Sequence, residues 1–310
     1  MIVAAGLSPA WQRILRFSQL HLGEVNRAVE AHACASGKVL NVGLALHALN
    51  PAQAKTIALV GGETGDAIEC EFAQVGAAAR WVRSGQTTRV CTTLLEDGGR
   101  TTELVENAAP ASADELAAFA AAYREEAASA AVVVLTGSLP QGTPREFYRD
   151  LLDAAPVATV ADVRGPELML MLECAKPPLV VKPNREELAA TLGRPLASDS
   201  ELLDGMRQLN AAGAQWVVIS QGARAVWVTS QQAAYRLQPP TLPVVNPIGC
   251  GDCMAAGIAW GIAQGLEVPD AVRLGVAAAG DNLTQRLPAR IDRQRVEKLA
   301  STIAIERLTA

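Results

Sequence analysis

The sequence predicts an α/β protein with a mainly parallel central sheet, helices on both faces of that sheet, and a small β-sheet lid. Short β-branched runs alternate along the chain with segments rich in alanine and leucine, which is the pattern of repeated strand–helix–strand units. Two segments, residues 11–35 and 87–106, interrupt this alternation. In open sheets of this kind ligands bind beyond the carboxyl ends of the strands, so polar sequence directly after strands marks the expected site.

The individual elements follow from the spacing of apolar residues. Residues 1–6 lack a basic region and predict a buried first strand, not a signal peptide. Further strands are predicted at Thr56 to Val60, Val132 to Leu135, Val157 to Ala161, Leu179 to Val181 and Trp216 to Ile219. Helices are predicted at Lys38 to Leu49, Ala113 to Ala128, Arg145 to Ala154, Ser200 to Ala211 and Gly251 to Leu266.

Residues 87–106 predict a hairpin, because Thr87 to Glu96 and Thr101 to Glu106 flank the turn Asp97-Gly98-Gly99-Arg100. Paired with strand-like sequence in residues 11–35, the hairpin is expected to lie over the ligand edge as a lid. No linker, low-complexity tract or internal repeat divides the chain. Residues 1–310 are therefore predicted to form one domain into which the lid segments are inserted.

Composition excludes several classes of function. The 310 residues include 27 Lys and Arg against 32 Asp and Glu, which gives a formal net charge of −5. No run of basic residues forms the kind of patch that binds nucleic acid or a membrane surface. Hydrophobic residues make up 50% of the chain, yet no stretch reaches the ~20 apolar residues of a membrane span. The six cysteines are too sparse for a disulfide framework, which indicates a reducing compartment. A cytoplasmic protein with a small-molecule partner is expected.

The most informative segment is Asn246 to Asp252, which follows a proline-rich stretch and opens a predicted helix. Gly249 and Gly251 allow the backbone to approach a ligand, and the helix N-terminus offers unpaired N–H groups to an anion. Asp252 stands beside that anion site as a potential base. The alternative interpretation is that the glycines shape a turn and Asp252 caps the helix.

A second polar segment, Lys182 to Glu187, directly follows an apolar strand. Asn184 and Glu187 are three residues apart, so one helical turn places an amide and a carboxylate on a face suited to ordering water around Mg²⁺. The alternative is a capping box in which Asn184 is the N-cap and Glu187 its partner. The two interpretations are compatible.

Two further segments add polar groups at the same edge. Ser36-Gly37-Lys38 resembles the end of a P-loop but lacks the earlier glycine and the Ser or Thr that should follow the lysine. Gly37, Lys38 and Asn41 can still form a polar floor at a helix N-terminus. Ser138, directly after a strand, offers another donor in a common type of loop.

Cys250 and Cys253 form a C-x-x-C pair, for which redox and zinc functions are disfavoured. A thioredoxin-like motif belongs to a small fold, and the histidines that zinc would need lie far away in sequence. The helix N-terminus is expected to lower the pKa of a nearby thiol. A bulky adduct on either cysteine is expected to inhibit, because it would intrude on the anion site.

In this order the motifs resemble those of the ribokinase and PfkB family of carbohydrate kinases, most closely the branch of 1-phosphofructokinase and tagatose-6-phosphate kinase. The resemblance covers nearly the whole chain and implies a ribokinase-like three-layer α/β/α fold. Its motifs are Ser8-Pro9-Ala10-Trp11, Leu22-Gly23-Glu24-Val25-Asn26-Arg27, Ser36-Gly37-Lys38 with Asn41, Thr88-Arg89, Gly137-Ser138-Leu139-Pro140, Lys182-Pro183-Asn184-Arg185-Glu186-Glu187, Ser220-Gln221-Gly222-Ala223 and Gly249-Cys250-Gly251-Asp252.

The resemblance implies transfer of the γ-phosphate of ATP to a sugar-phosphate hydroxyl, with Mg²⁺ as cofactor. Asp252 would be the base, and the backbone N–H groups of Gly249, Cys250 and Gly251 would stabilise the transferring phosphoryl group. Asn184 and Glu187 would organise Mg²⁺ and its waters. The residues implied around ATP are Lys182, Asn184, Ser220, Gly222, Ala223 and Ala225.

The residues implied around the acceptor are Gln12, Arg27, Gly37, Lys38, Asn41, Arg89 and Ser138. Lys38, Arg89 and Ser138 would hold the phosphate already on the sugar, with Arg27 reaching in from the lid. Gly37 and Asn41 would contact the sugar, and the lid would close over it and exclude water. Family analogy also suggests a homodimer through the lid strands, whose free edges need covering.

One departure from the family pattern bears on the acceptor. Family members carry an Asp that accepts hydrogen bonds from sugar hydroxyls where this chain has Gln12, and glutamine presents a donor as well as an acceptor. The leading acceptors are fructose 1-phosphate and tagatose 6-phosphate, and fructose 6-phosphate or an uncommon sugar is the alternative. A sugar-phosphate sensor with weak catalysis is a third hypothesis, against which the retained Asp252 argues.

Overall fold

A ten-stranded sheet forms the centre of the computed structural model, which describes residues 1–155 and 157–308. Its neighbouring strands run parallel from one edge to β11, and the last three strands are antiparallel. In order across the sheet the strands are β5 (Ala79–Arg83), β4 (Ala54–Val60), β1 (Ile2–Gly6), β8 (Val132–Thr136), β9 (Ala158–Asp162), β10 (Val180–Val181), β11 (Trp216–Gln221), β12 (Arg224–Thr229), β13 (Ala234–Leu237) and β14 (Ile305–Leu308).

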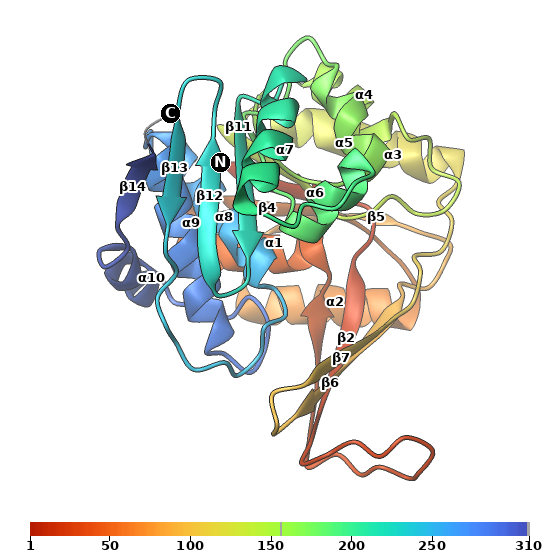
Figure 1. Cartoon of the computed structure of the whole chain (residues 1–310). Coiled ribbons are helices and arrows are strands. Elements are labelled where there is room, and N and C mark those ends of the chain that lie inside the picture. The colour runs from red at the N-terminus through yellow and green to blue at the C-terminus, as the bar shows by residue number, and fades with distance from the viewer. Residues whose placement is uncertain (156, 309–310) are drawn as a thin grey trace.

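Helices cover both faces of this sheet (Figure 1). The first face packs against α1 (Lys38–Leu49), α2 (Gly62–Val75), α8 (Cys250–Ala263), α9 (Val268–Leu283) and α10 (Arg293–Ala300), and a short 3-10 turn, Pro51–Gln53, follows α1. The second face packs against α3 (Ala113–Ala127), α4 (Phe147–Ala154), α5 (Gly165–Leu172), α6 (Arg185–Leu192) and α7 (Asp199–Ala211).

The central strand β1 shows why the sheet needs cover on both sides. Ile2 and Ala4 belong to the first core, whereas Val3 and Ala5 belong to the second, and all four are buried. Successive side chains of a strand point to opposite faces, so a strand that is apolar at every position must be buried on both. The predicted three-layer α/β/α architecture is confirmed. Within the described residues, no helix is long and apolar enough to cross a membrane.

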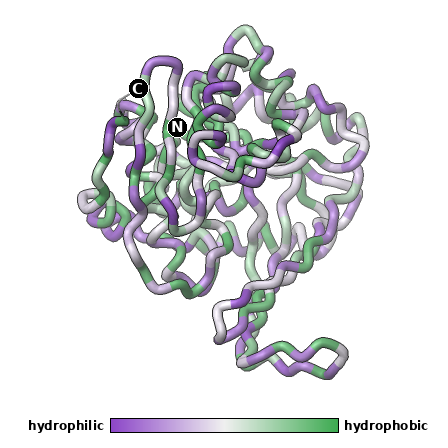
Figure 2. The backbone as a smooth tube through the Cα atoms, in the orientation of Figure 1, coloured by the Kyte–Doolittle hydropathy of each residue, from purple (hydrophilic) through white to green (hydrophobic). Residues whose placement is uncertain are grey.

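A second, four-stranded sheet is built from the two segments that interrupt the strand–helix alternation. Its strands, in order, are β3 (Glu30–Ser36), β2 (Ala10–Phe17), β6 (Val90–Glu96) and β7 (Thr101–Val105). The predicted turn at residues 97–100 joins β6 and β7, with Gly99 at φ 82°. This lid sheet and the loop between β2 and β3 project from the body of the protein, and the loop carries apolar as well as polar segments (Figures 1 and 2).

The antiparallel strands at one edge of the main sheet were not among the predicted elements. Strands β12, β13 and β14 and helices α9 and α10 were not predicted from the spacing of apolar residues. The reason is that β13 and β14 lie near the sheet edge and are only partly buried, with patterns that mix exposed and intermediate positions. Such strands lack the continuous apolar run that marks the buried strands β8 and β9.

The fold brings the carboxyl ends of the parallel strands to one edge, beneath the lid sheet. Strands β8 and β9 pair in register from Val132 opposite Ala158 to Thr136 opposite Asp162, so the loops after them lie side by side. Strand β10 pairs with β9 and leads directly to Lys182. The polar segments predicted to carry chemistry therefore meet in space.

Candidate active site

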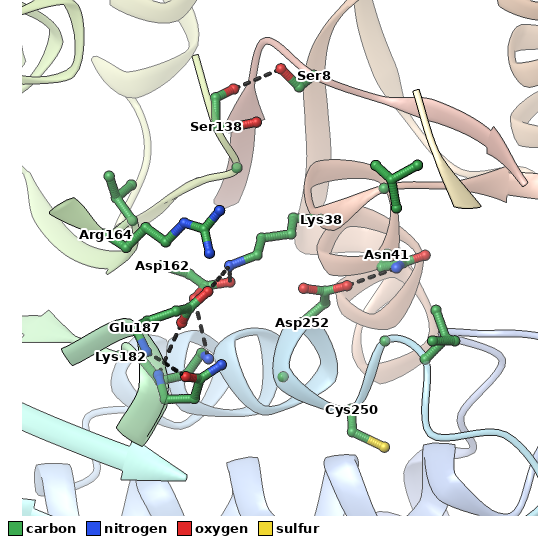
Figure 3. A pocket seen from close by; sticks show the side chains of 18 of the residues that line it. Ser8, Lys38, Asn41, Ser138, Asp162, Arg164, Lys182, Glu187, Cys250 and Asp252 are labelled. Carbon is green, nitrogen blue, oxygen red and sulfur yellow. Dashed lines mark hydrogen bonds and ion pairs between the residues drawn. The ribbon is translucent and has the colours of Figure 1, made fainter. Parts of the chain in front are cut away.

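A cavity of about 1070 Å³ lies between this edge of the main sheet and the lid sheet, and Figure 3 shows the side chains that surround it. The structure places most of the predicted site residues in its wall. Those residues are Gln12, Gly37, Lys38, Asn41, Arg89, Ser138, Lys182, Asn184, Glu187, Ser220, Gly222, Gly249, Cys250, Gly251 and Asp252. Segments that lie far apart in the sequence, from Gln12 to Asp252, thus form one site.

Three predicted site residues do not line the cavity. Arg27 is exposed on the loop between β2 and β3, which projects away from the body, so it does not reach the cavity of its own chain. Ala223 lies in the turn before β12, where its carbonyl accepts a hydrogen bond from Gln238 Nε2 at 3.0 Å. Ala225 is part of β12 itself and is not among the residues that line the cavity.

Asp252 lies in the first turn of α8 and is buried, with 7% of its surface exposed. Its Oδ2 accepts a hydrogen bond from Asn41 Nδ2 at 2.7 Å, and Asn41 Oδ1 accepts one from Ser36 Oγ at 3.0 Å. Burial raises the pKa of the Asp252 carboxyl to about 6, and the nearby Asp162 carboxylate adds to the effect. A carboxylate with that pKa is well suited to accept a proton near neutral pH.

We expect kcat/KM to fall about tenfold per pH unit below pH 6, because protonated Asp252 cannot act as a base. Phosphate esters titrate in the same range, with a second pKa of about 6. The variant Asn41→Ala separates the two causes. It removes a hydrogen bond that lowers the pKa of Asp252, so the acid limb of the profile should move to higher pH, whereas a limb due to the substrate would stay in place.

The N-terminus of α8 forms an anion site beside Asp252. Gly249 is its N-cap and adopts φ 84°, a left-handed conformation that favours glycine. The first helical hydrogen bond runs from Cys253 N to Gly249 O at 2.8 Å, and within residues 1–155 and 157–308 the N–H groups of Gly251 and Asp252 have no acceptor. Unpaired N–H groups at a helix N-terminus bind phosphate and similar anions.

Two buried asparagines hold the loop that leads into α8. Asn246 Oδ1 accepts a hydrogen bond from Ile248 N at 3.0 Å, and Asn282 Nδ2 donates to Ile248 O at 2.9 Å. Each asparagine is 1% exposed, so neither is free to turn to solvent. The anion site is therefore fixed before a ligand arrives, which is the condition for strong electrostatic stabilisation.

Asp162, at the end of β9, is the electrostatic centre of the site. Its Oδ1 lies 3.2 Å from Lys182 Nζ, its Oδ2 lies 3.2 Å from Lys38 Nζ, and Thr136 Oγ1 donates to Oδ2 at 3.2 Å. Burial alone would raise the pKa of Asp162, but the two ammonium groups outweigh it and hold that pKa below its usual range. Asp162 therefore stays ionised and fixes both lysines at the cavity floor.

Lys182 also borders the anion site. A side-chain carbon placed on Gly251 would lie 3.5 Å from Lys182 Nζ, so the ammonium group sits directly beside the backbone of the first turn of α8. Its side chain is only 4% exposed. A cation next to unpaired N–H groups adds to the attraction for an anionic ligand.

Asn184 and Glu187 form the capping box that was one of the two interpretations of their spacing. Asn184 Oδ1 accepts from Glu187 N at 2.7 Å, and Glu187 Oε2 accepts from Asn184 N at 3.0 Å. The other oxygen, Glu187 Oε1, lies 3.4 Å from Lys38 Nζ. Burial acts to lower the pKa of Lys38, but the carboxylates of Asp162, Glu187 and Asp252 outweigh it and raise that pKa.

The lid sheet lines the upper side of the cavity with a mixed set of groups. Gln12 is 4% exposed, and its Nε2 donates to Thr93 Oγ1 at 2.7 Å. Glu103 stands opposite Thr93 on the neighbouring strand and also lines the cavity. Burial raises the pKa of Glu103, which has no hydrogen-bond or ion-pair partner within the described part of the chain.

Four passages of the chain between the body and the lid converge at a narrow neck, which comprises residues 8–10, 37, 89 and 106. Arg89 donates from Nη2 to Ser8 O at 3.1 Å, from Nε to Pro9 O at 3.3 Å and from Nη1 to Glu106 O at 3.0 Å. Gly37 adopts φ 83°, and a side-chain carbon there would lie 2.9 Å from Ala10 N. Arg89 thus donates three hydrogen bonds to backbone oxygens and ties the passages of the neck together.

The opposite end of the cavity is formed by the loops after β10 and β11. A parallel bridge joins Asn184 to Ser220, which places the start of α6 beside the turn at Gly222. Arg185 Nη1 donates to Gln221 Oε1 at 2.7 Å, and Gln221 Nε2 donates to Ala225 O at 3.1 Å. These hydrogen bonds hold the start of α6 against the turn between β11 and β12 at this end of the cavity.

The comparison with known families agrees with this arrangement. A model described as the pfkB family carbohydrate kinase matches residues 10–291. The chain belongs to the PfkB family of carbohydrate kinases.

Solved structures of PfkB-type and ribokinase-type enzymes share this fold. Phosphofructokinase-2 from Escherichia coli, in complex with substrates and products, superposes with a TM-score of 0.89 at 23% identity, over 97% of this chain and 98% of that one. A possible 1-phosphofructokinase from Thermotoga maritima gives a TM-score of 0.90 at 20% identity, over 99% of each chain. Arabidopsis thaliana ribokinase, in complex with ribose and ATP, gives a TM-score of 0.75 at 21% identity, over 96% and 98%.

The functional residue that the motifs missed in this PfkB kinase is Asp162. The signal for it was present, since Asp162 is the first charged residue after the predicted strand Val157 to Ala161, at the edge where ligands are expected. Its pairing with Lys38 and Lys182 is set by the tertiary structure. Arg164, Glu103 and Arg224 also line the cavity and were not predicted.

The expected lowering of a cysteine pKa at the N-terminus of α8 is wrong. Burial raises the pKa of Cys250 to about 11, and the Asp252 carboxylate raises it further. Burial also raises the pKa of Cys253 well above its usual value. The field of the helix end does not compensate for the loss of water around these thiols.

We therefore expect both thiols of this PfkB kinase to react slowly at neutral pH, and Cys250→Ala to leave turnover near that of the native chain. The substitution leaves the N–H groups of Gly251 and Asp252 in place, so the anion site keeps its donors. Timed alkylation followed by mass spectrometry should show the exposed Cys70 labelled first. Rapid labelling of Cys250 would contradict this account of its environment.

Proposed function

We propose that this PfkB kinase transfers the γ-phosphate of ATP to a hydroxyl of a phosphorylated ketohexose, with fructose 1-phosphate or tagatose 6-phosphate as the leading acceptors. The observation that carries the proposal is the pairing of buried Asp252 with the unpaired N–H groups of the first turn of α8. A base and an anion site in adjacent positions are the two elements that phosphoryl transfer to a hydroxyl requires.

In the proposed reaction Asp252 accepts the proton of the acceptor hydroxyl while that oxygen forms a bond to the γ-phosphorus. The bond between the γ-phosphorus and the bridging oxygen breaks, and ADP leaves with the electron pair. Negative charge on the transferring group is met by the N–H groups of Gly251 and Asp252 and by the ammonium of Lys182. The hydrogen bond from Asn41 favours the ionised form of Asp252 and so opposes the effect of burial on its pKa.

The residues around Lys38 fit a magnesium ion that keeps most of its waters. Among the residues described, no three His, Cys, Asp or Glu side chains gather closely enough to hold a metal by themselves. Mg²⁺ in kinases usually takes one or two carboxylates together with substrate phosphates. Glu187, joined to Asn184 in the capping box, and Asp162, which like Glu187 contacts Lys38, would hold the ion or its waters. When bound, the ion would neutralise charge on the phosphate oxygens of ATP.

A second candidate keeps the reaction and changes the acceptor to fructose 6-phosphate or an uncommon sugar. The observation in its favour is the chemistry of the lid, where Gln12 and Glu103 face the cavity and Arg27 does not. A carboxylate repels a phosphate but accepts hydrogen bonds from hydroxyl or amino groups. The acceptor end is therefore suited to a sugar whose hydroxyl-bearing side faces the lid.

The test is Mg²⁺-dependent release of ADP with a panel of acceptors: fructose 1-phosphate, tagatose 6-phosphate, fructose 6-phosphate, free fructose, ribose and adenosine. We expect one phosphorylated ketose to give the highest kcat/KM. Turnover with free fructose alone would overturn the sugar-phosphate assignment. Silence across the panel, with ATP binding shown by calorimetry, would contradict the leading acceptors and favour an acceptor outside the panel or a binding role.

We also propose that two copies associate through their lids. Leu22, Val25 and Val29 are 89%, 83% and 58% exposed on the projecting loop, an exposure that a second copy would reduce. We expect sedimentation velocity to show a dimer for the native chain and a monomer for the double variant Leu22→Asp, Val25→Asp. Leu266→Asp, which alters an exposed leucine on the body, is the matched control and should stay dimeric. A native monomer would refute the proposal.

A further inference from the structure

Arg164 extends into the cavity from the loop between β9 and α5, at the N-cap position of α5. Figure 3 shows its guanidinium pointing toward the ammonium of Lys38 and the carboxylate of Asp162. The residue makes no side-chain capping bond to its helix, so its orientation does not serve the local structure. Its side chain is exposed within the open cavity.

The charges around Arg164 leave it without a counterion. Lys182 pairs with Asp162, and Lys38 pairs with both Asp162 and Glu187. Across residues 1–155 and 157–308, Arg164 has neither an ion pair nor a side-chain hydrogen bond. Arg164 is therefore the cation of this group whose charge is left for an incoming phosphoryl group to meet.

The neighbouring loop adds backbone and hydroxyl groups to the same space. Gly137 N donates to Asp162 O at 3.4 Å, which joins the loop after β8 to the loop after β9. Ser138 lines the cavity there, and a side-chain carbon on Gly137 would lie 4.0 Å from Lys38 Cβ. Arg164, Lys38 and Ser138 therefore border a common region, reached from three different elements.

We infer that Arg164 binds a phosphoryl group in this region, and the inference rests on the proposed kinase function. Arginine suits the task because its planar fork can donate two parallel hydrogen bonds to phosphate oxygens and remains charged at every physiological pH. Two phosphoryl groups enter the site during the proposed reaction, the γ-phosphate of ATP and the phosphate of the acceptor. Both offer the same chemistry to Arg164.

The experiment compares Arg164→Gln and Arg164→Lys with the native chain and with Arg207→Gln. Arg207 is an exposed arginine on α7, outside the cavity and without an ion pair in the described residues, so its variant controls for the loss of one surface charge. Equilibrium binding of ADP and of β,γ-imido-ATP is measured by calorimetry, and KM for the acceptor is measured separately.

If Arg164 contacts the γ-phosphate, Arg164→Gln should weaken binding of β,γ-imido-ATP about tenfold or more and leave ADP binding unchanged. If it contacts the phosphate of the acceptor, both nucleotides should bind as before, and KM for the phosphorylated acceptor should rise by a similar factor. Arg164→Lys should recover only part of either loss, because an ammonium cannot reproduce the fork. Arg207→Gln should behave like the native chain in every assay.

The inference is overturned if Arg164→Gln binds both nucleotides and the acceptor like the native chain, or if its losses equal those of Arg207→Gln. The nucleotide measurements need no turnover. A native chain that binds β,γ-imido-ATP but phosphorylates no sugar would therefore refute the proposed function. The role of Arg164 toward ATP would still be decided by the binding data.

Discussion

Replacement of Asp252 by asparagine should lower kcat by about 10²- to 10⁴-fold, the usual contribution of a general base. Asparagine keeps the shape and the position beside Asn41, but its amide cannot accept the proton of the acceptor hydroxyl. The unpaired N–H groups at the start of α8 persist, so binding of ATP should change little. Coupled measurement of ADP release gives kcat, and calorimetry gives the affinity for ATP.

The matched control for this variant is Asp204→Asn, which alters an exposed carboxylate on α7 outside the cavity. It should retain native turnover. Unchanged turnover in Asp252→Asn would remove Asp252 from the role of base. Loss of ATP binding in the same variant would instead assign Asp252 to the nucleotide site.

Replacement of Asp162 by asparagine should reduce the free energy of unfolding by about 3–5 kcal/mol, the usual effect of removing one partner from a buried ion pair. Asp162 is 2% exposed and the Lys182 side chain 4%, so the ammonium group would be left in the interior without its carboxylate. Turnover should fall as well, since Lys38 and Lys182 are both positioned by Asp162.

Urea unfolding of Asp162→Asn, Lys182→Met and the double variant tests this prediction. If the pair is coupled, the double variant should be less destabilised than the sum of the two single variants, because it leaves no buried charge unpaired. Strict additivity would show that Asp162 and Lys182 do not stabilise each other. The turnover of the double variant should stay low, since the cation beside Gly251 is lost.

The parts of the site that lie on contiguous sequence could be predicted, and those that depend on distant partners could not. Gly249 to Asp252 places two glycines, a helix start and a carboxylate in one segment, so the anion site and the candidate base follow from local rules. The sequence around Asp162 indicates only its place directly after a predicted strand, because its pairing depends on lysines contributed by α1 and by the segment after β10.

The fold shows the same contrast between features set by contiguous sequence and features set by distant partners. Strands β8 and β9 are buried on both faces and have continuous apolar runs, and both were predicted within a residue of their observed bounds. Strands near the sheet edge, such as β13, are only partly buried, and their stability comes from neighbouring strands rather than from their own sequence. The position of Arg27 depends on the path of an exposed loop, which the spacing of motifs does not determine.

The neck of residues 8–10, 37, 89 and 106 has a consequence for exchanging lids between enzymes of this family. Because Arg89 binds the backbone of two other passages, at residues 8–9 and at residue 106, and Gly37 packs against Ala10, no single contiguous graft carries a complete lid. A chimaera that receives residues 10–36 without 89–106 would combine mismatched halves at this joint. Exchange of acceptor preference should therefore require both segments together, transplanted as one unit.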